Sequence, residues 1–136
     1  MGTDFEGSQG LVTYKGKLLF LKRDKFDKKA SGLWCLLGGG PNQGETPEET
    51  LKRELKEEAN IRTSNYKLVF KRPSMNNPKL FTYIFLVNLN DEELENIKIG
   101  DEGEKLQFFY LDEIKDLTLV SSLEKYFDIY RKYIIS

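Results

Sequence analysis

The sequence predicts an α/β layered fold in which helices cover a sheet on both sides. Short apolar runs bounded by turn-forming residues are typical of strands, and they alternate with one strongly capped helical segment and one amphipathic segment near the end. The length of 136 residues is that of one ordinary domain. We therefore expect a single domain over residues 1–136, in which the polar residues 1–10 form a flexible N-terminus.

Three strands are predicted before the first helix. Residues 11–14 and 17–23 show strand-like patterning and are separated by a tight turn at Lys15 and Gly16. A polar loop follows at 24–32, and residues 33–37 form a short apolar run. Three glycines and a proline at 38–41 force the chain out of regular structure, so the third strand is expected to stop at residue 37.

The first helix has a clear beginning and end in the sequence. Thr46 suits the N-cap, Pro47 suits the first helical position, and Glu49 completes a capping box with Thr46. Asn60 can adopt the left-handed conformation that follows many helices. The helix is therefore predicted to run from Thr46 to about Ala59.

The remaining segments complete the sheet and add a last helix. Residues 66–72, 81–87 and 106–111 are predicted strands, and the second of them is apolar on both faces and therefore central. Residues 91–99 are acidic and leave the choice of element open, while Asp112 is expected to cap a brief helical turn. Apolar residues at helical spacing predict an amphipathic terminal helix: Val120, Leu123, Phe127, Tyr130 and Ile134.

The composition excludes several kinds of active site. With no histidine and one cysteine, Cys35, the chain cannot form a Ser-His-Asp triad, a histidine-built zinc site or an internal disulfide. Metal chemistry must then use carboxylates, which favours Mg²⁺ or Mn²⁺. The net charge of −1 gives no field that would attract polymeric nucleic acid or a membrane. Residues 1–10 lack the apolar core of a signal peptide, and we expect a cytoplasmic protein.

One face of the first helix gathers carboxylates. Glu54, Glu57 and Glu58 fall within an arc of roughly 100°, next to the arc that the core-facing residues occupy. Like charges four residues apart destabilise a helix by a few tenths of a kcal/mol, so folding alone does not favour this arrangement. A divalent cation reverses the argument, because carboxylate oxygens are the ligands that hard cations prefer.

The spacing around these carboxylates resembles the Nudix box. Gly39 is followed after five residues by Glu45, and after seven more by the segment RELKEEANI at 53–61. The family pattern is Gly, five residues, Glu, seven residues, Arg-Glu, an aliphatic residue, any residue, Glu-Glu, any residue, Gly and a final aliphatic. Asn60 replaces the usual glycine, and Leu37 replaces a proline that relatives often have. Asparagine tolerates positive φ best among the other residues, so the helix end is preserved.

The resemblance extends from about residue 11 to residue 117 and implies an α/β/α sandwich with a central mixed β-sheet. It implies that Glu54, Glu57 and Glu58 bind the cations, together with Glu102 or, as second choice, Glu104. Arg53 and Glu45 are implied to organise the loop and the helix. The implied general base is Glu57 or a carboxylate near Glu102. Together with Glu54 and Arg53, these residues are the catalytic candidates. Gly38, Gly39, Gly40 and Arg23 are the candidate substrate contacts.

The function implied is Mg²⁺-dependent hydrolysis of a diphosphate bond in a small-molecule nucleotide, by default a nucleoside triphosphate, with Mn²⁺ as an alternative cation. A non-catalytic Nudix module that senses a nucleotide is the alternative, and complete retention of the box carboxylates argues against it. An activity like that of isopentenyl-diphosphate isomerase would need histidine ligands and is excluded. A homodimer is left open, because dimers are common in the family.

Overall fold

The computed structural model describes residues 5–23, 32–100 and 103–134. The helices and strands in chain order are β1 (Gly7–Tyr14), β2 (Lys17–Arg23), β3 (Trp34–Cys35), β4 (Leu37–Gly39), α1 (Pro47–Ala59), β5 (Tyr66–Pro73), β6 (Phe81–Asn88), α2 (Asp91–Glu95), β7 (Gly103–Tyr110), the 3-10 helix η1 (Leu111–Asp116) and α3 (Ser121–Ile134).

The strands form one mixed sheet. Within the described residues seven strands are connected, in the order β3-β2-β1-β6-β5, with β4 paired to β1 and β7 paired to β2. Strands β1 and β6 are parallel from the pair Gly7 and Thr82 to the pair Thr13 and Asn88, and the other pairings are antiparallel. Parallel neighbours need a long connection, and here α1 lies within it.

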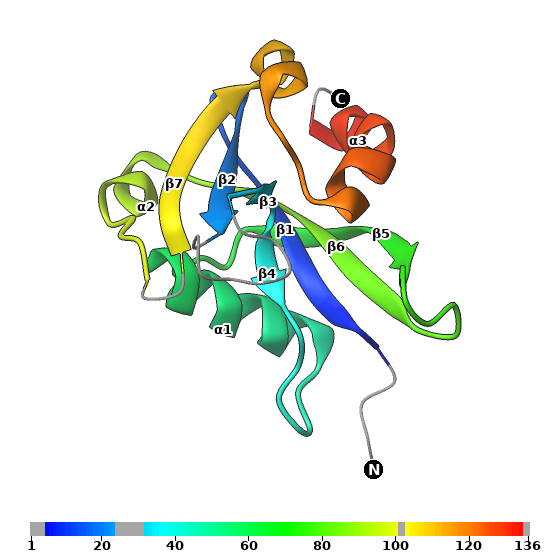
Figure 1. The fold of residues 1–136 in the computed structure, drawn as a ribbon. Coiled ribbons are helices and arrows are strands. Elements are labelled where there is room, and N and C mark those ends of the chain that lie inside the picture. Colours follow the sequence, from blue (N-terminus) through cyan, green and yellow to red (C-terminus); the bar gives the residue numbers. More distant parts are fainter. Residues whose placement is uncertain (1–4, 24–31, 101–102, 135–136) are drawn as a thin grey trace.

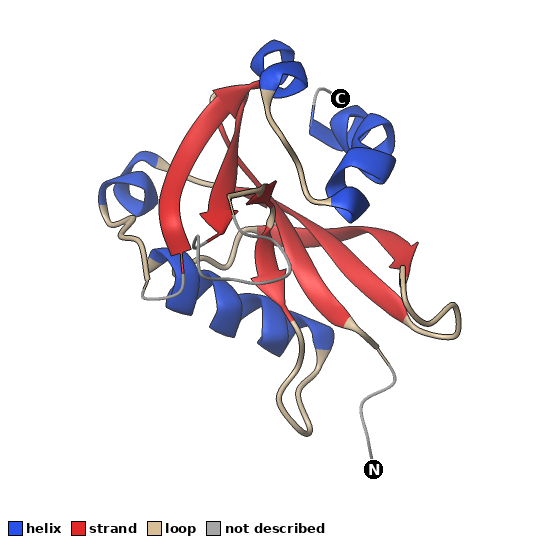
Figure 2. Cartoon of the chain, in the orientation of Figure 1, coloured by secondary structure: helices blue, strands red, loops and turns tan. Residues whose placement is uncertain are grey.

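Helices α1 and α3 lie on opposite faces of the sheet (Figure 1, Figure 2), and a hydrophobic cluster lies between each helix and the sheet. On one side, α1 buries Leu51, Leu55 and Ala59 against alternate residues of the strands. On the other side, α3 buries Leu123 and Tyr130. The arrangement is an α/β/α sandwich around a mixed sheet, which confirms the predicted fold class. None of the helices in the described part of the chain has the length and apolar character that a membrane crossing needs.

Helix α1 begins and ends as the sequence predicts. The Thr46 side chain accepts a hydrogen bond from the Glu49 N–H at 3.2 Å, and the Glu49 carboxylate accepts one from the Thr46 N–H at 2.9 Å. Asn60 adopts the left-handed conformation with φ of 55°, and the Ile61 N–H then bonds back to the Leu55 carbonyl. The helix is therefore fixed at both ends, which fixes the direction of its carboxylate face.

Several predicted boundaries are corrected. Strand β1 begins at Gly7 and not at residue 11, because Gly7 to Gly10 pair with β6; residues 7–10 thus belong to the sheet rather than to a flexible N-terminus, and residues 1–4 lie outside the described residues. The run at 33–37 forms two short strands, and the second continues to Gly39 by pairing with β1.

Two helical segments also differ from their predictions. The open segment at 91–99 contains α2, for which Asn90 and Glu93 form a reciprocal capping box. Asp112 does not cap the turn after β7, since η1 already begins at Leu111 and Tyr110 occupies the N-cap position. The Tyr110 N–H is bound by the Glu113 carboxylate at 2.7 Å.

Candidate active site

Arg53 connects the carboxylate face of α1, formed by Glu54, Glu57 and Glu58, to the glycine loop at residues 38–41. Its Nε and Nη2 donate to the two oxygens of Glu45 at 2.7 and 3.0 Å. Its Nη1 donates to Glu54 at 2.9 Å and to Glu57 at 3.2 Å, and its Nη2 also donates to the Gly40 carbonyl at 2.8 Å. One planar guanidinium thus fixes two helix carboxylates, the loop acid and the loop backbone relative to one another.

Glu45 is held within the loop as firmly as Arg53. Its Oε1 accepts hydrogen bonds from the Asn42 N–H at 2.7 Å and from the Thr50 hydroxyl at 3.0 Å. The Arg53 hydrogen bond is the main cause that lowers the pKa of Glu45 to about 2, and the same contact raises the pKa of Arg53. Glu45 is therefore ionised at neutral pH and forms an ion pair with Arg53.

The other end of the carboxylate face contacts the glycine loop directly. Glu58 accepts a hydrogen bond from the Gly38 N–H at 2.7 Å, and a Cβ at Gly39 would lie 2.6 Å from Glu54 Oε1. A Cβ at Gly38 would lie 2.2 Å from the Ser8 carbonyl oxygen, and Gly38 has a φ of 141°. Glycine is required at position 38 for the loop to approach β1, and at position 39 it leaves room for the Glu54 carboxylate.

Carboxylates outnumber the guanidinium in this network. Glu45, Glu54 and Glu57 contact Arg53, and Glu58 lies on the same helix face, bound to the Gly38 N–H. The Glu57 side chain is 58% exposed, whereas that of Glu54 is 15% exposed. Within the described residues, these side chains do not converge into a group of three that encloses a cation position. Glu54 and Glu57 turn toward Arg53 instead.

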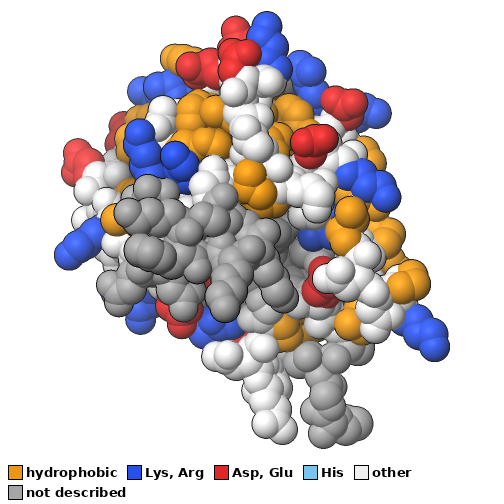
Figure 3. Space-filling view, viewed as in Figure 1, with side chains coloured by type: hydrophobic (Ala, Val, Ile, Leu, Met, Phe, Trp, Pro, Cys, Tyr) orange, Lys and Arg blue, Asp and Glu red, His pale blue; other side chains and the backbone are white. Residues whose placement is uncertain are grey.

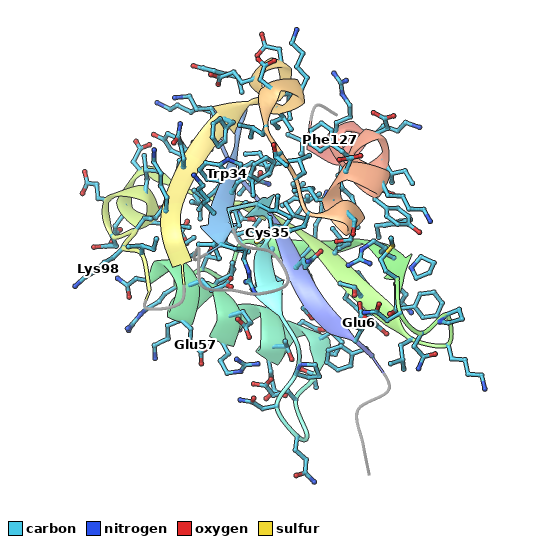
Figure 4. All side chains as sticks on the ribbon, viewed as in Figure 1. Glu6, Trp34, Cys35, Glu57, Lys98 and Phe127 are labelled. Atoms are coloured by element: carbon cyan, nitrogen blue, oxygen red, sulfur yellow. The ribbon has the colours of Figure 1, made fainter. Side chains whose placement is uncertain are left out.

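The segment before β7 packs on the C-terminal end of α1, near Glu57 and Glu58. The Lys98 N–H donates to the Ala59 carbonyl and the Gly100 N–H donates to the Glu58 carbonyl, both at 2.9 Å. Figure 4 shows Lys98 and Glu57 at this end of the molecule. Glu102 follows directly in the sequence but lies outside the described residues, as does the side chain of Glu104. Their assignment as additional ligands stays a prediction.

Arg23, the other predicted contact, ends β2. It pairs with Gly103 of β7, and its backbone N–H donates to the Leu33 carbonyl at 3.0 Å. Its side chain is half-buried. Cys35, also singled out by the sequence, is a buried thiol that contacts the Leu21 carbonyl.

A second polar group lies beside the glycine loop, and no motif in the sequence predicts that its members meet. Glu6 and Arg72 line a pocket of about 180 Å³ together with Gly39, Gly40 and Thr82. The Arg72 side chain is buried, although it lies in a strand with exposed neighbours. Little in a single sequence points to this burial, because Arg72 is one of several basic residues between Lys67 and Lys79.

Comparison with known proteins gives a family match over nearly the whole chain, in addition to the geometry of the loop and helix. The family model described as the NUDIX domain matches residues 8–129. The chain belongs to the Nudix family. The ADP-ribose pyrophosphatase of Methanocaldococcus jannaschii is 30% identical in an alignment of 112 positions, which covers 79% of this chain and 63% of that protein. This Nudix chain therefore spans less than two thirds of the length of that relative.

Solved structures of Nudix proteins show the same fold. The MutT protein from Methanosarcina mazei Go1 superposes with a TM-score of 0.74 at 19% identity, covering 98% of this chain and 97% of that one. The NUDIX domain of Shewanella oneidensis NrtR, solved in complex with ADP ribose, superposes with a TM-score of 0.77 at 14% identity, covering 98% and 90%. At these identities the two structures establish the Nudix architecture of the sheet and its helices.

Proposed function

We propose that this Nudix chain hydrolyses the diphosphate bond of a nucleoside diphosphate derivative with the help of a divalent cation. The observation that supports this most directly is the Arg53 network, which ties the helix carboxylates to the backbone of the glycine loop. A diphosphate needs cationic neutralisation on one side and close backbone approach on the other. The helix carboxylates would hold the cation, and the glycine loop would allow the close backbone approach.

The donor set fits Mg²⁺. All side chains that would hold it are carboxylates, Glu54, Glu57 and Glu58, and carboxylate oxygens are the ligands that a hard cation prefers. Mn²⁺ accepts the same oxygen ligands. When bound, such a cation supplies charge neutralisation of the phosphates and a lower pKa for a bound water.

The protein side chains divide the remaining tasks. We propose Glu57 as the group that accepts a proton from water, with a carboxylate near Glu102 as the alternative; Glu57 is the more exposed of the two helix carboxylates that Arg53 contacts. Arg53 and Glu45 act as positioning residues, because their contacts are made within the loop and helix. Gly38, Gly39 and Gly40 bring the loop backbone near the carboxylates without side chains in the way.

A nucleoside triphosphate is the substrate class we propose first. ADP-ribose is a second candidate, favoured by the ADP-ribose pyrophosphatase of Methanocaldococcus jannaschii and by the ADP ribose bound to the NrtR domain. On the face shown in Figure 3, basic and acidic side chains of the described residues are interspersed, which supports a small-molecule partner over polymeric nucleic acid. A homodimer and a cytoplasmic location stay predictions.

The test is phosphate release from a panel of nucleoside triphosphates, nucleotide sugars and ADP-ribose, with coupled phosphatase, in Mg²⁺, in Mn²⁺ and in chelator. The Glu57→Gln variant should lose at least about 100-fold in kcat. Glu48→Gln, which changes an exposed acid in the first turn of α1, should retain the native rate. A folded protein that binds a panel member and cleaves none would replace the hydrolase with a nucleotide-sensing module.

A further inference from the structure

The pocket beside the glycine loop has the size of one flat heterocycle. Its volume of about 180 Å³ corresponds to about six water molecules. Gly39 lines this pocket, and the same residue lies against the Glu54 carboxylate. In Figure 4 the end of β4 lies between Glu57 on α1 and Glu6 just before β1. A ligand in the pocket would thus sit next to the proposed phosphate site.

Arg72 is a buried cation without a matching anion. Its side chain is 3% exposed, its Nη1 donates only to the Pro73 carbonyl at 3.3 Å, and its Nε has no hydrogen-bond partner. Among the described residues no carboxylate forms an ion pair with it. A buried guanidinium with unused donors is costly for folding. Its donors therefore suit a ligand that is absent from the free protein.

Helix α3 holds this guanidinium in place. The Arg72 guanidinium carbon lies 5.8 Å from the centre of the Tyr126 ring, and Tyr126 stacks on Tyr130 with ring centres 6.3 Å apart. Burial raises the pKa of Tyr130 to about 12, and the nearby Arg72 charge acts in the opposite direction. Because the Tyr126 ring packs against the guanidinium and the side chain is buried, Arg72 has less conformational freedom to lose when a ligand binds.

Glu6 supplies the opposite chemistry in the same pocket. Its Oε1 accepts from the Thr82 hydroxyl at 2.9 Å, and its Oε2 accepts from the Ser74 hydroxyl. Each carboxylate oxygen can accept a second hydrogen bond. Since Glu6 and Arg72 line one pocket without pairing, the pocket presents a fixed acceptor group and a fixed donor group with space between them.

We propose that this pocket binds the guanine base of the substrate, with Arg72 donating to O6 and N7 and Glu6 accepting from N1–H and N2–H. Guanine has two neighbouring acceptors that match an arginine fork and two neighbouring donors that match a carboxylate. In adenine, N1 is an acceptor and would face the Glu6 carboxylate without a hydrogen. The 6-amino group is a donor, so only N7 could accept a hydrogen bond from Arg72. A phosphate group would be repelled by Glu6.

The inference rests on the proposed function, because the phosphates of a guanine nucleotide held here would extend over Gly39 and Gly40 toward Glu54. It deepens that function by naming a guanine nucleotide as the substrate. The base and the phosphates would be bound by different parts of the chain: β1 and β5 with their neighbouring loops on one side, and α1 on the other.

Two measurements distinguish recognition of the guanine base from hydrolysis of the diphosphate bond. Calorimetric binding of GMP and AMP compares the two bases with the same phosphate group, and Mg²⁺-dependent hydrolysis of GTP and ATP reports both base selection and the reaction. GMP should bind at least about 10-fold more tightly than AMP, with a similar ratio of kcat/KM for GTP over ATP. Arg72→Met should reduce both ratios to near one, and Glu6→Gln should lower them at least several-fold. Arg131→Met, at an exposed arginine of α3, should leave them unchanged.

The outcomes are distinct. Arg72→Met replaces a buried side chain with an apolar one of similar length and is checked by thermal unfolding; if it does not fold, Glu6→Gln alone decides. Hydrolysis without preference for GTP, preference for ATP or ADP-ribose, or ratios unchanged in both variants would overturn the guanine pocket and leave the hydrolase standing. Selective GMP binding without hydrolysis of any nucleotide would support the pocket and remove the proposed reaction.

Discussion

Replacing Gly39 with alanine is expected to displace the Glu54 carboxylate while the fold stays intact. The new Cβ would lie 2.6 Å from Glu54 Oε1 and 2.7 Å from its Cδ. Ordinary contact begins at 3.4 Å, so the carboxylate must withdraw by about 0.8 Å. Because the obstacle is the end of a flexible side chain and the backbone at Gly39 does not require positive φ, the main chain need not move.

The expected cost falls on activity. A misplacement of about 1 Å in a catalytic group can lower the rate by about 100-fold, so kcat/KM in Mg²⁺ should fall by that order. The free energy of unfolding should change by less than about 1 kcal/mol, which corresponds to a few degrees in Tm. Coupled phosphate release and a thermal melt on the same preparation measure the two quantities.

Gly38→Ala is the matched comparison. Its Cβ would lie 2.2 Å from the Ser8 carbonyl oxygen and 2.6 Å from the Gln9 Cα, and the φ of 141° strains any L-residue. Here the main chain of β1 or of the loop must move, so Gly38→Ala should lose several kcal/mol of stability as well as activity. A Gly39→Ala protein with native kcat/KM would refute the link between the glycine loop and Glu54. So would a Gly39→Ala protein that unfolds like Gly38→Ala.

Three further predictions concern stability and are measured by urea unfolding. Arg53 lowers the pKa of Glu45 from an ordinary 4.5 to about 2, so the ionised Glu45 stabilises the fold above pH 4.5, and this stabilisation is lost as the pH falls toward 2. In Glu45→Gln, the free energy of unfolding should depend less on pH over this range. Burial raises the pKa of Tyr130 from 10.0 to about 12, so stability should fall as the pH rises between these values. Tyr130→Phe should abolish this alkaline loss and, since the hydroxyl has no hydrogen-bond partner, should be no less stable at neutral pH. Leu55→Ala, at a side chain that is 1% exposed, should cost about 3 kcal/mol, and a cost below about 1 kcal/mol would contradict the packing of α1 on the sheet.

Helix α1 could be predicted from the sequence because its determinants are local. Thr46 and Glu49 bind each other's backbone N–H groups, and Pro47 has no N–H that would need a partner. Asn60 adopts the left-handed conformation that closes the last turn, as predicted. The carboxylate face follows from helical geometry alone, since the direction of each side chain is set by its position in the helix. The contact between Glu58 and the Gly38 N–H joins two positions 20 residues apart, which the family spacing already relates.

Segments whose structure depends on distant strands were predicted less well. Nothing within residues 7–10 signals a strand, because the pairing partner is β6, more than 70 residues later in the chain. The glycines at 7 and 10 and the polar Ser8 and Gln9 have low strand propensity. They form a strand because they pair with β6 and with β4. Glycine at position 7 leaves room for β4, since a Cβ there would lie 2.6 Å from the Gly39 carbonyl oxygen. Tertiary pairing here overrides local preference.

The position of Arg72 depends on a single irregularity in the sheet. The register of β5 against β6 shifts between Leu68, opposite Phe85, and Phe70, opposite Ile84. The extra residue reverses the alternation, so that Tyr66 packs on the α1 side of the sheet whereas Phe70 packs on α3, and Arg72 follows Phe70 to the same face. Without the bulge, Arg72 would share the face of Tyr66, away from the aromatic rings of α3. A local sequence motif therefore specifies the proposed phosphate chemistry, while a long-range register specifies the residue to which we assign base selection.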